Sequence, residues 1–115
     1  MSVTIYHNPR CTKSRETLAL LESKGIKPTV IEYLKTPPSA AEIKKLLAMM
    51  GKSPREAMRK GEAPYKDLGL ADEGLSDTQL IKAMAENPIL IERPIVVNGS
   101  KAALGRPPES VLKIF

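Results

Sequence analysis

Residues 3–15 read VTIYHNPRCTKSR and join an apolar run to the only cysteine of the 115-residue chain. Residues 3–6 are β-branched or aromatic, which is typical of a buried strand. Asn8-Pro9 ends such a run, so the strand should stop just before Cys11. A lone thiol forms no disulfide within its own chain, and redox chemistry at Cys11 would therefore need a thiol from another molecule.

A helix and a second strand should follow the cysteine. Leucines at 18, 20 and 21 and the helix-ending Gly25 predict a helix over 15–23. Residues 28–34 read PTVIEYL and predict a strand. The resulting β-α-β unit should have parallel strands and a right-handed crossover.

The middle of the chain is expected to be helical. Capping boxes, in which a serine precedes Glu or Gln by three residues, occur at Ser39, Ser53 and Ser76. They predict helices near 40–50, 54–60 and 77–86, with a looser stretch around 61–65. No repeat or linker is evident, so the segment 39–87 is interpreted as a helical insertion in a single domain covering residues 1–115.

The last quarter returns to strands. Residues 95–97 and 101–104 flank Asn98-Gly99, a favoured hairpin turn. Pro107-Pro108 should open a final helix that runs to Ile114. The economical way to bury this order of elements is an α/β fold with a four-stranded mixed sheet and helices on its faces.

Composition argues against several function classes. One Cys and one His are too few ligands for a structural zinc, and no phosphate-binding glycine loop precedes a Lys-Ser/Thr pair. The net charge is +5, but the basic residues are dispersed and only one Phe, three Tyr and no Trp are present. We therefore expect no nucleic-acid binding. The chain shows no signal peptide or membrane span, and with its free cysteine this favours a cytoplasmic protein.

The position of Cys11 favours a reactive thiol. A helix amino terminus offers unpaired N–H groups and partial positive charge, which stabilise a thiolate and also attract an oxyanion. Arg10, Lys13 and Arg15 add positive charge near the thiol. The alternative for Lys13 and Arg15 is a side chain that points into solvent. The alternative is an inert buried cysteine.

Ser14 and His7 are candidate catalytic partners of the thiol. Ser14 stands where a dithiol redox protein carries its second cysteine; a hydroxyl donates a hydrogen bond to a thiolate but does not resolve a covalent adduct. Its alternative role is to cap the helix. His7 is a candidate base or charge partner for the thiolate, and a purely structural hydrogen bond is the alternative.

Several ordered motifs resemble the glutaredoxin-coupled arsenate reductases. They are Tyr6-His7-Asn8-Pro9-x-Cys11-x-x-Ser14-Arg15, Tyr33-Leu34-x-x-Pro37-Pro38-Ser39, Arg59-Lys60, Tyr65-x-x-Leu68-Gly69-Leu70, Pro88-Ile89-Leu90-Ile91-x-Arg93-Pro94-Ile95-Val96-Val97 and Leu104-x-Arg106-Pro107. The match covers nearly the whole chain.

The resemblance implies a thioredoxin-like fold and reduction of arsenate to arsenite with glutathione and glutaredoxin. By the same resemblance Cys11 attacks arsenate, Arg59, Arg93 and Arg106 bind the oxyanion, and His7 lies near the thiol. Arginine suits this role because its planar fork of donors matches tetrahedral oxygens and stays charged near neutrality. The fold also implies a cis bond before Pro94. No bound cofactor is expected, glutathione being a co-substrate, and a monomer is expected.

Two alternatives come from other functional classes. One is a redox regulator like the Spx proteins, which share the fold and bind RNA polymerase; those carry Cys-x-x-Cys, whereas this chain has Ser14. The other is a glutathione-dependent thiol oxidoreductase with a different substrate.

Overall fold

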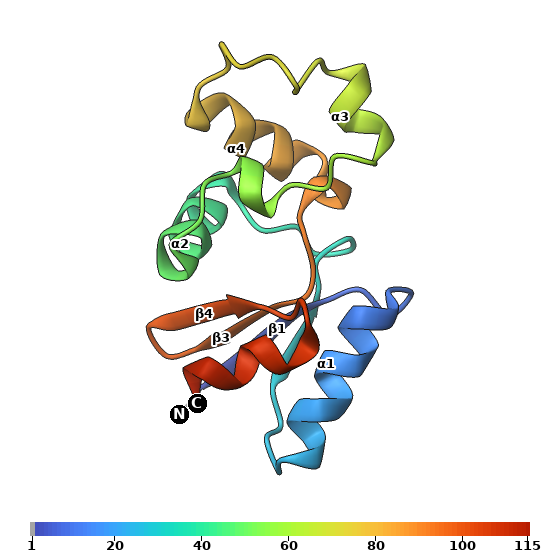
Figure 1. Ribbon diagram of the computed structural model, residues 1–115, viewed down its shortest axis with the longest axis vertical. Coiled ribbons are helices and arrows are strands. Elements are labelled where there is room, and N and C mark those ends of the chain that lie inside the picture. The colour runs from blue at the N-terminus through green and yellow to red at the C-terminus, as the bar shows by residue number, and fades with distance from the viewer. Residues whose placement is uncertain (1) are drawn as a thin grey trace. The chain divides into compact units, whose positions relative to one another are not determined.

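The computed structural model describes residues 2–115, which form two compact units. The first comprises the chain up to Thr36 together with Arg93–Phe115, and the second comprises Pro37–Glu92. Figure 1 shows the strands of the first unit and the helices of the second. No helix within residues 2–115 is long and apolar enough to cross a membrane.

The first unit is built on a four-stranded mixed sheet in the order β2-β1-β3-β4. The strands are β1 (Val3–His7), β2 (Thr29–Glu32), β3 (Ile95–Asn98) and β4 (Lys101–Leu104). β1 pairs parallel with β2 and antiparallel with β3, and β3 pairs antiparallel with β4. The predicted mixed sheet and the parallel β1–β2 pair are confirmed.

A small apolar core joins this sheet to two helices. Ile5, Leu21, Val96 and Val111 are fully buried together. Leu21 belongs to α1 (Thr12–Ser23) and Val111 to the 3-10 helix η3 (Pro108–Ile114), and these two helices pack against each other. The core therefore fixes α1 on β1, with the start of α1 directly after the loop that follows β1.

Several boundaries in this unit differ from prediction, and β2 is shorter than the expected 28–34. α1 begins at Thr12 rather than Arg15, because the Cys11 carbonyl accepts the Arg15 N–H at 3.0 Å and starts the helix within polar residues. The hairpin turn is Gly99-Ser100 rather than Asn98-Gly99, since Asn98 pairs with Lys101. Gly99 takes a φ of 61°, which glycine adopts without steric cost.

The second unit is helical, as predicted. α2 (Ala40–Met50) and α4 (Asp77–Glu86) pack against each other, and complete capping boxes at Ser39 and Ser76 begin them. α3 (Ala63–Asp67) forms a short helix where a looser stretch was expected.

The helix predicted over 54–60 is wrong. Both hydrogen bonds between Ser53 and Glu56 form, at 2.9 and 3.3 Å, but only the 3-10 turn η1 (Arg55–Ala57) follows. Residues 57–59 instead pair with residues 90–92, at the end of η2 (Pro88–Leu90) and just beyond it. Arg59 N–H donates to the Leu90 carbonyl at 2.7 Å, and Glu92 N–H donates to the Ala57 carbonyl at 2.8 Å. This long-range pairing replaces the local helix.

Gly105, directly after β4, is a point of close approach within the first unit. A Cβ at this position would collide with the Thr17 side chain of α1 and would lie 2.8 Å from Pro94 Cγ. We predict that Gly105→Ala lowers the free energy of unfolding by about 1–3 kcal/mol, because overpacking forces neighbouring atoms to move. Urea denaturation measures the free energy of unfolding. Gly61→Ala is the control, because a Cβ at that position meets nothing within 4 Å. Equal stability of the two variants would contradict the prediction.

Candidate active site

The turn between β1 and α1 holds Cys11 at the amino end of the helix. Cys11 N–H donates to the Asn8 carbonyl at 3.0 Å, and the Asn8 side-chain oxygen accepts the Arg10 N–H at 3.0 Å. Proline is favoured at the second position of such a turn, which Pro9 occupies. Arg15 also ties α1 to the turn by donating to the Pro9 carbonyl at 2.9 Å. The Asn-Pro pair thus sets the geometry of the thiol.

Cys11 is the residue that caps the amino end of α1 and is partly exposed. Its neutral side chain makes no capping hydrogen bond. Burial raises the pKa of the thiol, but the Ser14 N–H, a hydrogen bond and charge from Arg93, and the Lys13 N–H together bring the pKa below its ordinary value. The thiolate is thus favoured at the place where an attacking nucleophile is accessible.

The hairpin brings two predicted arginines to this sulfur. Arg93 precedes β3 and Arg106 follows β4, so the antiparallel β3–β4 pair places them at the same end of the hairpin. Arg106 Nε donates to the Arg93 carbonyl at 2.9 Å, and Arg106 Nη2 lies 3.7 Å from Cys11 Sγ. Arg93 lowers the pKa of the thiol through a hydrogen bond and through its charge. The bonds preceding Pro94 and Pro107 are both cis; the first confirms the prediction, and the second was not predicted.

The side chains of His7 and Ser14 contact each other on the buried side of the turn. Alternation along β1 puts His7 on the same face as Ile5, toward α1. His7 Nδ1 lies 2.6 Å from Ser14 Oγ, which also accepts the Asn8 N–H at 3.0 Å. Ser14 is completely buried. Its hydroxyl therefore braces the loop, and its backbone N–H faces Cys11.

The pKa of His7 is lowered by burial and by Arg15, with Glu32 opposing them. His7 is therefore neutral near pH 7. A neutral imidazole with its proton on Nε2 accepts a hydrogen bond at Nδ1 from the Ser14 hydroxyl. Because His7 is neutral, it adds no positive charge to that of Arg15 in this buried region behind the loop.

Arg59, the third predicted arginine, belongs to the second unit. Arg59 Nη1 lies 2.9 Å from the Glu92 carboxylate, and Arg59 Nε lies 3.8 Å from that of Glu62. Of these two contacts, only the one with Glu62 is predictable from the sequence, because oppositely charged residues three apart are often neighbours. Glu92 pairs with Arg59 through the strand-like pairing of residues 57–59, which sequence reasoning missed.

The helix N–H groups expected at Cys11 are those of Lys13 and Ser14, whereas Asn8 was missed as a site component. An Asn before a Pro-containing turn is a recognisable signal, because its side chain bonds the backbone two residues on. Within residues 2–115 no group of three or more His, Cys, Asp or Glu side chains is arranged to hold a metal ion.

The chain is similar to proteins of one family throughout its length. The ArsC family model matches residues 6–114. The Escherichia coli (strain K12) protein YfgD, which is uncharacterised, is 58% identical over 97% of this chain and 95% of its own. An arsenate reductase of Haemophilus influenzae is 52% identical over 100% of both chains. The structure of an arsenate reductase from Vibrio cholerae, 59% identical, superposes with a TM-score of 0.97 over 100% of this chain and 98% of that one. With a family model that spans the cysteine turn, the hairpin arginines and the segment between them, this chain belongs to the ArsC family.

Proposed function

We propose that this protein is an arsenate reductase, with Cys11 as the nucleophile and Arg93 and Arg106 as oxyanion ligands. The observation that carries the proposal is the position of the Arg106 guanidinium, 3.7 Å from the Cys11 sulfur, together with the lowering of the pKa of that thiol by Arg93. Arsenate is an anion at neutral pH, and two fixed cations hold it beside the thiolate without loss of their own charge. Arsenate reductases at 52% identity over the full chain support the same substrate.

With Cys11 as the enzyme's one thiol, the reduction of arsenate proceeds through two successive external thiols. The Cys11 thiolate forms an S–As(V) bond while an arsenate oxygen leaves as water. The thiolate of glutathione then attacks the Cys11 sulfur, and the S–As bond pair moves to arsenic, which leaves as arsenite. Two electrons have passed from sulfur to arsenic, and a mixed disulfide remains on Cys11. A glutaredoxin thiol attacks that disulfide and returns the Cys11 thiolate.

The structure of the loop supports these steps. The Ser14 and Lys13 N–H groups stabilise negative charge at the helix start, both on the sulfur and on an oxyanion bound there. Ser14 carries a hydroxyl, which does not resolve a thiol adduct, so an outside thiol must do so. We assign His7 and Ser14 to positioning of the loop. We propose Arg59 as the third oxyanion ligand on the family resemblance alone; within the second unit its contacts are with Glu62 and Glu92.

The electron donors place the reaction in a reducing compartment. A partly exposed, low-pKa thiol stays reduced where glutathione is abundant, as in the cytosol. We propose that the protein acts there as a monomer, with glutathione and glutaredoxin as its reducing partners and without a resident cofactor.

A coupled assay tests the activity. Purified protein with arsenate, glutathione, glutaredoxin and glutathione reductase should consume NADPH, and Cys11→Ser should abolish this arsenate-dependent consumption because serine is not a nucleophile or a redox centre here. If wild-type protein is no faster than Cys11→Ser, the assignment fails.

The two hairpin arginines can be tested separately. Arg93→Ala and Arg106→Ala should each raise the KM for arsenate about 10- to 100-fold, the equivalent of one charged hydrogen bond. Lys101→Ala, an exposed cation on β4, is the control and should leave KM unchanged. Circular-dichroism melts establish that each variant folds. Wild-type KM in both arginine variants would remove them from the site.

The lowered pKa of Cys11 predicts a pH profile for its reactivity. Only the thiolate is alkylated, so the rate rises as the pH passes through the pKa, and a lowered pKa moves that rise to lower pH. Iodoacetamide should therefore modify Cys11 of the native protein with a midpoint below that of the urea-unfolded chain. Arg93→Gln should move the midpoint upward. A native profile that coincides with that of the urea-unfolded chain would contradict the prediction.

A further inference from the structure

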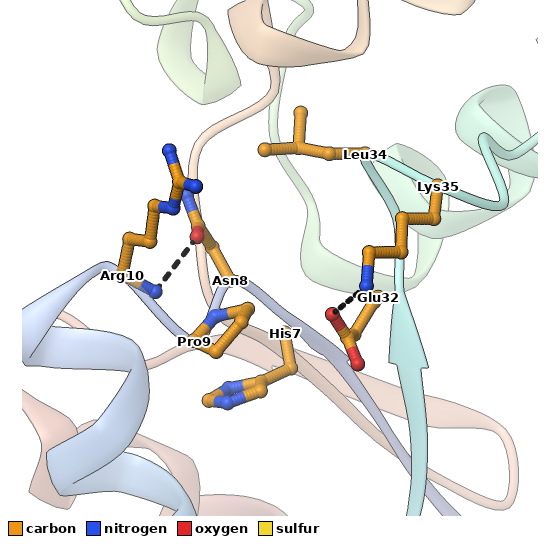
Figure 2. Close-up of a pocket in the computed structure, with 7 residues that line it drawn as sticks. All are labelled: His7, Asn8, Pro9, Arg10, Glu32, Leu34 and Lys35. Carbon is orange, nitrogen blue, oxygen red and sulfur yellow. Dashed lines mark hydrogen bonds and ion pairs between the residues drawn. The ribbon is translucent and has the colours of Figure 1, made fainter.

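A pocket of about 230 Å³ lies beside the cysteine turn, entirely within the first unit. Residues 7–10 form one wall, and Glu32, Leu34 and Lys35 form the other. Figure 2 shows Arg10 on one side and Leu34, Glu32 and Lys35 on the opposite side, with Pro9 between them. None of these last five residues has a role in the arsenate chemistry above.

The pocket lies at the ends of two strands, and its wall includes the residues that lead up to Cys11. His7 and Glu32 are the last residues of the parallel strands β1 and β2, and ligands of α/β sheets bind beyond the carboxyl ends of such strands. Arg10 directly precedes Cys11, so the backbone of this pocket wall continues into the thiol-bearing residue, with about 3.8 Å between the two Cα atoms.

The charges of the pocket match a particular kind of thiol. Arg10 and Lys35 are cationic and Glu32 is anionic, which gives a net charge of +1 if each is ionised. Glutathione carries two carboxylates and one ammonium group, for a net charge of −1. Its γ-glutamyl end is a zwitterion that requires an anion and a cation side by side, and its glycyl end requires a second cation.

Glu32 and Lys35 meet the first requirement. Lys35 Nζ lies 3.5 Å from a Glu32 carboxylate oxygen, and the side chains are 80% and 42% exposed respectively. Such an exposed pair is weakly held, so the two groups exchange partners at little cost. Leu34 and Pro9 supply apolar surface for the methylene groups between the charged end and the peptide.

We propose that this pocket binds glutathione, with its γ-glutamyl zwitterion on Glu32 and Lys35 and its glycyl carboxylate on Arg10. The proposal rests on the proposed function for the identity of the reductant. The volume is below the 300–1,000 Å³ typical of sites that enclose a whole ligand. The pocket therefore holds the γ-glutamyl arm and leaves the cysteinyl sulfur outside, free to reach Cys11.

The test uses disulfide exchange at Cys11 without arsenate. The Cys11 thiolate attacks oxidised glutathione, forming a Cys11–glutathione mixed disulfide and releasing one glutathione thiolate; intact-protein mass spectrometry follows the rate. The disulfide of cysteinylglycine, which lacks the γ-glutamyl arm, is the comparison substrate. Wild-type protein should prefer oxidised glutathione about tenfold or more.

The double variant Glu32→Gln/Lys35→Gln removes the complementary charges while leaving the net charge of the protein unchanged. It should react with both disulfides at nearly the same rate. The uncharged 2-hydroxyethyl disulfide reports intrinsic thiol reactivity, which corrects for any effect of Glu32 on His7. Lys101→Gln/Glu109→Gln, an exposed pair elsewhere in the same unit, is the matched control and should keep the wild-type preference.

The outcomes separate the two proposals. If the pocket variant keeps the wild-type preference for oxidised glutathione, the pocket assignment is overturned, even when arsenate is reduced normally. If the preference collapses only in the pocket variant, the assignment stands, even when the wild-type protein fails to reduce arsenate and the proposed function falls.

Discussion

The structure depends on the attachment of the α1 amino terminus to the end of β1. The Asn8 carbonyl and side chain hold the turn, Arg15 fastens α1 to it, and the buried contact between His7 and Ser14 supports it from the core side. This bracing fixes the direction of the helix N–H groups. Their partial positive charge counters the desolvation of Cys11, so a loose turn would lose both thiolate and anion stabilisation.

The hairpin adds the charges that the turn lacks. Arg93 and Arg106 are thirteen residues apart in sequence, yet the β3–β4 register brings them together, and Arg106 bonds the Arg93 backbone at 2.9 Å. A guanidinium anchored to a carbonyl loses less conformational freedom when it binds an anion. Gly105 allows the same end of the hairpin to lie close to α1.

Local signals in the sequence predicted most of the fold, and long-range pairing accounts for the principal error. The Ser39 and Ser76 boxes begin helices whose apolar faces are buried against each other. The Ser53 box forms with similar hydrogen bonds but begins only a single turn, because Ala57 and Arg59 pair with residues near Leu90. Sequence periodicity contains no information about that partner. The position of Cys11 and the hairpin arginines was predictable, whereas the bond between His7 and Ser14 was not.

Position 14 carries a serine, whose hydroxyl does not resolve a thiol adduct, so this part of the chain supplies a single redox-active group, the Cys11 thiol. Ser14 lies one helical turn from Cys11, but its Oγ is completely buried and is held by His7 and the Asn8 N–H. A side chain in this orientation faces the sheet and leaves the Cys11 sulfur to the arginines. Resolution of any adduct on Cys11 therefore falls to a thiol that arrives from solvent. The access that this thiol needs is consistent with a nucleophile that is only partly buried, at a turn rather than within the core.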